Sequence, residues 1–224
     1  MTISPKIVLI FLSSFAGAFF VVFMVVALMQ TNLDILAADP LKVLNVDAEA
    51  SIPTWYAQSL LLVAAALVFV IAKAAAKDKK YWYVLAGIML FISIDEGASI
   101  HELLITPMRD LLNISSGPLY YAWVIVYGLL FVGVGLFFVR FFMRLPRRTR
   151  VFFAAALAMF LAGALGMEMI GGFVISQASM SWQLYVMIVG VEELLEMLGV
   201  ALFIYALLQY AGGYQKHYRL TLRQ

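Results

Sequence analysis

Residues 81–102 read YWYVLAGIMLFISIDEGASIHE. The first twelve carry no charge, and the last ten hold Asp95, Glu96, His101 and Glu102. A long uncharged run is typical of a helix inside a membrane, where ionisable side chains are costly and usually functional. The stretch therefore predicts a membrane span and marks where its chemistry lies.

The composition of the whole chain agrees with this interpretation. Of 224 residues, 65% are hydrophobic and 12% are charged, with a mean hydropathy of +0.99. Soluble domains are nearer to half apolar. We therefore expect one polytopic membrane domain over residues 1–224, without a separate soluble domain. The chain has no cysteine, which excludes disulfides, thiolate metal ligands and cysteine nucleophiles.

The apolar runs predict an all-α bundle of six transmembrane helices, because each is long enough for a bilayer core of about 30 Å. Lysine and arginine gather between spans two and three, between spans four and five, and after span six. The positive-inside rule then places both termini in the cytoplasm. We expect an integral protein of a bacterial cytoplasmic (inner) membrane. The six expected spans are roughly 6–30, 53–76, 81–105, 118–143, 150–176 and 182–210.

Further acids lie inside the fifth and sixth spans. Glu168 stands in LGMEMIGG, and Glu192, Glu193 and Glu196 stand in VEELLEMLG. At about 1.5 Å per helical residue, they reach depths similar to that of Asp95, in the outer half of the membrane. The sequence therefore predicts that carboxylates from three helices meet in one site.

In the third span, a continuous helix would put Asp95, Ser99 and Glu102 on one face, at i, i+4 and i+7. Glu96 and His101 would flank that face on opposite sides. Which of the four ionisable residues of this span point into the site stays open, and Glu102 also fits a solvated acid at the helix end.

The chemistry of the expected site is that of a divalent metal. No lysine or arginine lies inside these spans near the acids, and unpaired buried carboxylates either take up protons or bind cations. Oxygen ligands with one imidazole suit Fe, Mn or Zn, and two ions would neutralise four charges. The candidate metal ligands are Asp95, Glu96, His101, Glu102, Glu168, Glu192, Glu193 and Glu196.

Two classes of function stay open. The first is a metal-dependent membrane enzyme acting on a lipophilic substrate. The second is a transporter or channel for divalent metal or protons that uses the same acids. A third interpretation, a protonated polar core that only holds helices together, requires fewer acids than this chain has. We expect no nucleic-acid partner, and the sequence assigns no catalytic residue.

Aromatic residues open the fourth span at Tyr120, Tyr121, Trp123 and Tyr127. Such a group is typical of the aromatic belt at a membrane interface. A wall for a hydrophobic substrate is the second interpretation.

Overall fold

A computed structural model describes residues 4–29, 40–48, 50–177 and 179–214. These residues form helices and turns and no strand. The described elements are α1 (Pro5–Met29), η1 (Pro40–Leu44), α3 (Ile52–Ala74), α4 (Lys79–Ala98), η2 (His101–Leu104), α5 (Ile105–Leu112), α6 (Trp123–Arg144), α7 (Arg147–Leu161), η3 (Ala162–Met167), α8 (Glu168–Ile175) and α9 (Trp182–Tyr214).

Four described segments are long and apolar enough to cross a membrane, and a fifth is added if α4 and the bent continuation His101–Leu112 count as one span. The four are Pro5–Ala27, Ile52–Ala74, Trp123–Arg144 and Arg147–Ile175. The all-helical class expected from the sequence is therefore confirmed, with four to five candidate membrane-spanning helices.

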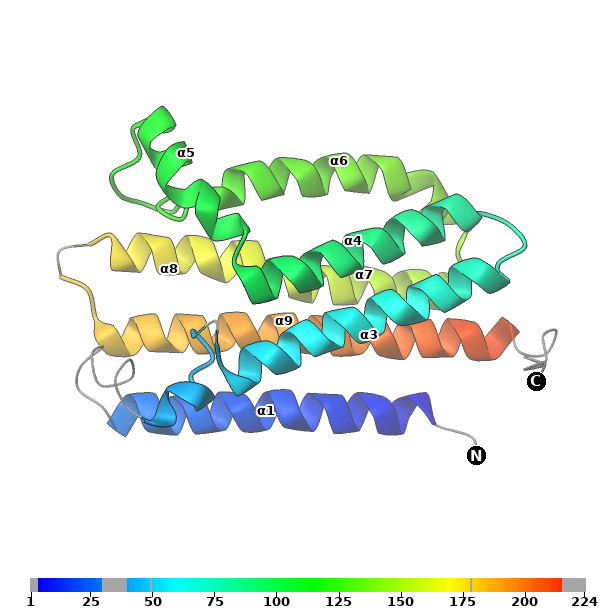
Figure 1. The fold of residues 1–224 in the computed structure, drawn as a ribbon, viewed down its shortest axis with the longest axis horizontal. Coiled ribbons are helices and arrows are strands. Elements are labelled where there is room, and N and C mark those ends of the chain that lie inside the picture. The colour runs from blue at the N-terminus through cyan, green and yellow to red at the C-terminus, as the bar shows by residue number, and fades with distance from the viewer. Residues whose placement is uncertain (1–3, 30–39, 49, 178, 215–224) are drawn as a thin grey trace.

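The long helices lie side by side along one direction (Figure 1). α1 begins and α9 ends at the same end of the bundle, where the turns α3–α4 and α6–α7 also lie. These turns carry Lys77 and Arg147 among other basic residues. We call this end the basic end. Lys216, Arg219 and Arg223, which also entered the orientation argument, lie outside the described residues.

α9 holds the bundle together, because α1, α3, α7 and α8 all pack along it. α3 also packs closely along α4. By contrast, the backbone of α6 packs mainly against η2. At the basic end, Trp82, Phe141 and Phe153 interlock edge to face in a buried cluster.

The expected continuous span 81–105 is wrong, because the helix breaks after Ala98. Ser99 takes a left-handed backbone conformation with φ 47°, and the following segment bends by 76°. A serine in this region costs about 1–3 kcal/mol and persists only where its surroundings hold it. Here the carboxylate of Asp95 accepts the backbone N–H of His101 at 2.9 Å, which replaces a helical hydrogen bond lost at the break.

Two other expected boundaries also change. The fourth helix begins at Trp123 and not at Pro118, because Gly117 turns the chain with φ 97° and its N–H donates to the Ser176 hydroxyl. The fifth helix is interrupted by the π-helical turn η3, directly before Glu168. Such turns hold one extra residue and are frequent at functional sites.

Candidate functional site

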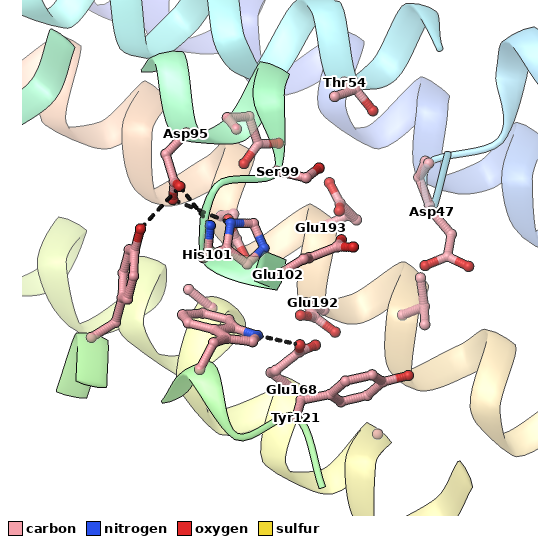
Figure 2. A pocket seen from close by; sticks show the side chains of 18 of the residues that line it. Asp47, Thr54, Asp95, Ser99, His101, Glu102, Tyr121, Glu168, Glu192 and Glu193 are labelled. Carbon is pink, nitrogen blue, oxygen red and sulfur yellow. Dashed lines mark hydrogen bonds and ion pairs between the residues drawn. The ribbon is translucent and has the colours of Figure 1, made fainter. Parts of the chain in front are cut away.

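A cavity of about 290 Å³ lies among α4, η2, α6, α8 and α9. All eight residues that the sequence predicted for the site line it. They are Asp95, Glu96, His101, Glu102, Glu168, Glu192, Glu193 and Glu196. Figure 2 labels six of them, which approach the cavity from several sides. The break at Ser99 makes this convergence possible, because it brings His101 and Glu102 back over the cavity after α4 has ended.

The cavity is strongly acidic. Its lining contains a further acid, Asp47, and among the described residues around it no lysine or arginine contributes to the wall. Eight carboxyl groups and one imidazole therefore share one space without a fixed cation. Carboxylates in such a space repel one another, so the site favours protons or bound cations.

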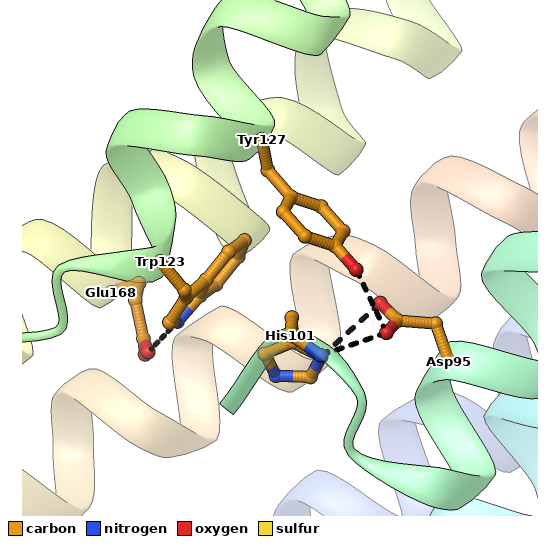
Figure 3. Close-up of polar contacts among 5 residues, drawn as sticks. All are labelled: Asp95, His101, Trp123, Tyr127 and Glu168. Atoms are coloured by element: carbon orange, nitrogen blue, oxygen red, sulfur yellow. Dashed lines mark hydrogen bonds and ion pairs between the residues drawn. The ribbon is translucent and has the colours of Figure 1, made fainter. Parts of the chain in front are cut away.

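Asp95 makes three polar contacts within the site. Its buried carboxylate accepts from the backbone N–H of His101 at 2.9 Å and from the Tyr127 hydroxyl at 3.0 Å. The other oxygen lies 3.2 Å from His101 Nδ1 (Figure 3). Asp95 therefore holds the chain break, the tyrosine and the imidazole in one arrangement.

His101 is oriented on two sides. Nδ1 faces Asp95, while the ring packs against Trp123 with centroids 4.6 Å apart. The other ring nitrogen, Nε2, is directed away from Asp95 (Figure 2). A carboxylate on Nδ1 favours the tautomer that carries its proton there and leaves Nε2 as an acceptor or metal ligand.

Glu168 is the first residue of α8, immediately after the π-helical turn. Its carboxylate accepts the indole N–H of Trp123 at 2.7 Å (Figure 3). Trp123 is only 6% exposed. The first interpretation of Trp123 and Tyr127 as part of an aromatic belt is therefore wrong, because their polar atoms bind the acids of the cavity.

Three acids come from α9. Glu192, Glu193 and Glu196 approach the turn η3 across a very close helix contact at Gly163. A Cβ atom at Gly163 would lie 2.8 Å from the carbonyl oxygen of Glu192 and 2.8 Å from Cγ of Glu196. The glycine thus lets α9 bring its acids to the level of Glu168.

Asp47 was missed as a site residue because it stands in a connecting segment that the sequence alone does not bring back to the spans. Its side chain is exposed and lines the cavity. The surrounding protein partly desolvates the carboxyl group and, together with the charges of Glu168 and Glu102, raises the pKa of Asp47 to about 7. Nearby, the hydroxyls of Tyr121 and Tyr185 are 3.2 Å apart. The sequence signal that could have identified Asp47 is its position directly after the apolar Val46.

The acids surround the cavity without converging on one point. Among the described residues, no three histidine, aspartate or glutamate side chains form a group that could hold a metal ion in their present rotamers. Binding one ion through three of them therefore requires side-chain rotation, which a water-sized space around the carboxylates permits.

Fold and cavity together define an all-helical protein with candidate membrane-spanning helices and an acidic interior site. The chain belongs to the family described as a domain of unknown function (DUF8692), which matches residues 14–210. No curated protein and no solved structure matches the chain.

Proposed function

We propose that this protein is a metal-dependent integral membrane enzyme acting on a lipophilic substrate. The observation that carries this proposal is the shared cavity, which eight carboxyl groups and His101 line without lysine or arginine among the described residues. Bound divalent ions would neutralise such a site and would supply Lewis-acid activation of water or of a substrate oxygen.

The ligands we assign are Glu168 from α8, Glu193 and Glu196 from α9, and His101 through Nε2. The remaining predicted residues, Asp95, Glu96, Glu102 and Glu192, together with Asp47, complete the surroundings. Asp95 positions the imidazole, which is the usual role of a carboxylate behind a histidine ligand. Oxygen ligands with one imidazole favour Fe, Mn or Zn over Mg, and the number of acids suits two ions.

The proposal includes the membrane arrangement. We propose one polytopic domain over residues 1–224 with six spans, α9 among them, in a bacterial cytoplasmic membrane with both termini inside. The gathering of basic turns at one end supports this orientation through the positive-inside rule. The acidic cavity would then open in the outer half of the bilayer.

A transporter or channel for divalent metal or protons is the second candidate. One observation favours it: no three of the described acids are arranged to hold one metal ion in their present rotamers. Against it, the neighbouring space toward the basic end is lined by apolar side chains, which suit a lipophilic molecule better than an ion.

Metal analysis of purified protein, without chelator treatment, tests the proposal. We expect at least one tightly bound Fe, Mn or Zn ion per chain. Glu168→Gln and Glu193→Gln keep the side-chain shape and remove the charge, so each should lower metal occupancy. Asp110→Asn is the matched control, because Asp110 is an exposed acid of α5 that does not line the cavity.

A metal-free wild-type protein with glutamine variants of equal or higher stability would overturn the enzyme proposal. The carboxyl groups would then be protonated partners. Flux of Mn²⁺ or protons into liposomes separates the second candidate from simple packing, since a packed polar core gives no flux.

A further inference from the structure

A second cavity, of about 200 Å³, lies next to the acidic one and toward the basic end. Side chains of α3, α4, α6, α7 and α9 line it, and all of them are apolar or glycine. Along α6 it runs from Phe131 to Phe142, which is about 16 Å at the helical rise per residue. The space is therefore long, narrow and unsuited to a polar ligand.

This apolar cavity adjoins the acidic one, because Ile92, Phe131 and Phe160 line both. A molecule that fills both would have a polar end among the carboxylates and an apolar chain among the phenylalanines.

The apolar cavity also adjoins an open apolar groove of about 740 Å³ between α4 and α6. Ile88, Val134 and Phe138 line both spaces. The groove is bounded by residues such as Leu129 and Leu130, which are 71% and 56% exposed and lie on a candidate membrane-spanning helix. The three spaces therefore lie one after another, from the exposed side of α6 to the acids, and together outline a route.

We infer that this route is the binding site and lateral entrance for a single-chain amphiphile, whose chain occupies the apolar cavity and whose polar end reaches the acidic cavity. The inference rests on the proposed function and names its substrate class. Access from the side is consistent with the packing of α6, whose backbone packs mainly against η2 and less against the other long helices.

The acidic cavity also selects the polar end of the ligand. Carboxylates accept hydrogen bonds and repel anions. The end group therefore donates hydrogen bonds and carries no negative charge, as a hydroxyl or an ammonium does. In the metal-free protein the same argument excludes a fatty acid of the same chain length, whereas bound divalent ions would neutralise the carboxylates and remove this repulsion.

Two glycines of α6 provide a matched test. A Cβ atom at Gly135 or at Gly128 would meet nothing within 4 Å, so a larger side chain enters open space at either position. Gly135 lines the apolar cavity, while Gly128 does not line any of the three spaces. Gly135→Leu fills the route, and Gly128→Leu changes the same helix without filling it.

The probe is dodecan-1-ol with a diazirine at the far end of its chain, photolysed with the protein in phosphatidylcholine nanodiscs. We expect adducts on residues at the basic end of the apolar cavity, such as Phe141 or Leu85. Gly135→Leu should reduce them at least tenfold and Gly128→Leu should leave them unchanged. In protein stripped of metal by a chelator, dodecylamine should compete with the probe, and dodecanoate should not.

Adducts confined to lipid-exposed residues such as Ile10 and Phe11, or equal labelling of both leucine variants, would overturn the inference. Competition by dodecanoate as strong as that by dodecylamine in the metal-free protein would overturn the assigned polar end. Metal content measured on the same samples separates the two proposals. If the purified protein contains no metal but Gly135→Leu blocks the labelling, the route is supported and the metal-enzyme proposal is contradicted. If the protein contains metal but shows no adducts in the apolar cavity, the metal-enzyme proposal is supported and the route is contradicted.

Discussion

His101 Nδ1 lies 3.2 Å from one carboxylate oxygen of Asp95, and the backbone N–H of His101 donates to the other oxygen at 2.9 Å. One buried side chain thereby holds both the backbone where α4 ends and the ring that follows. The relationship links the fold directly to the proposed chemistry, because the chain break and the ring orientation depend on the same carboxylate.

Asp95→Asn separates these two roles. The amide oxygen still accepts the backbone N–H, but the amide nitrogen would donate to Nδ1 and shift the ring proton to Nε2. A protonated Nε2 cannot bind a metal. We expect metal affinity to fall on the order of 10–100-fold, with a loss of about 1 kcal/mol in unfolding free energy. Equilibrium metal titration and SDS unfolding measure the two effects.

Tyr127→Phe is the control for that variant, because it removes a hydrogen bond to Asp95 without changing the tautomer of His101. Asp95→Ala also removes the acceptor of the backbone N–H, so its cost should rise to about 1–3 kcal/mol. If Asp95→Asn binds metal as tightly as the wild type, His101 is not a ligand through Nε2.

Gly163→Ala tests whether the close helix contact supports the site. The added methyl group would meet the backbone of α9 at 2.8 Å, and overpacking of this kind costs about 1–3 kcal/mol. Gly166, in the same π-helical turn, has only Leu161 O at 3.9 Å from the equivalent position. Gly166→Ala should therefore be neutral or stabilise by up to about 1 kcal/mol through helix propensity. Equal unfolding free energies for the two variants would contradict the packing.

Asp47 should titrate near neutral pH in the metal-free protein. Its pKa in the folded protein is about 7, against an ordinary value of 3.8. The folded state therefore keeps a proton that the unfolded state loses. This contribution to stability is fully present below about pH 4 and is lost as the pH rises through 7. The infrared difference spectrum between the wild type and Asp47→Asn should show a protonated carboxyl band that disappears around pH 7. The absence of this difference band would assign the titration to another acid.

The sequence predicted the helical class and the group of acids because both depend on local composition. Long apolar runs form helices in a membrane whatever their neighbours are, and acids inside such runs need a shared environment. The break after Ala98 could not be predicted in this way, because Ser99 has no strong preference for a left-handed backbone. It is held by Asp95, which contacts His101 only in the folded chain.

The roles of the aromatic residues at the start of α6 could not be predicted either, because they depend on how the helix is rotated about its axis. Trp123 and Tyr127 have the composition of an interfacial belt, and only the rotation of α6 decides whether they face lipid or the cavity. That rotation follows from the turn at Gly117 and from packing against η2. Asp47 likewise lies in the segment between η1 and α3. Hydrophobic periodicity predicts helices and says nothing about the course of such a connecting segment.

The membrane orientation is the last prediction. We expect the basic end to face the cytoplasm, since turns rich in lysine and arginine are retained inside. The chain has no native cysteine, so single substitutions report position without background. Asn45→Cys and Leu112→Cys should react with an impermeant maleimide in intact cells. Lys77→Cys and Arg147→Cys should react only after the membrane is made permeable.

Labelling of Lys77→Cys and Arg147→Cys in intact cells would reverse the orientation and place the acidic cavity in the cytoplasmic half of the bilayer. Labelling of Asn45→Cys without Leu112→Cys would instead show that residues 79–112 do not carry the chain across the membrane.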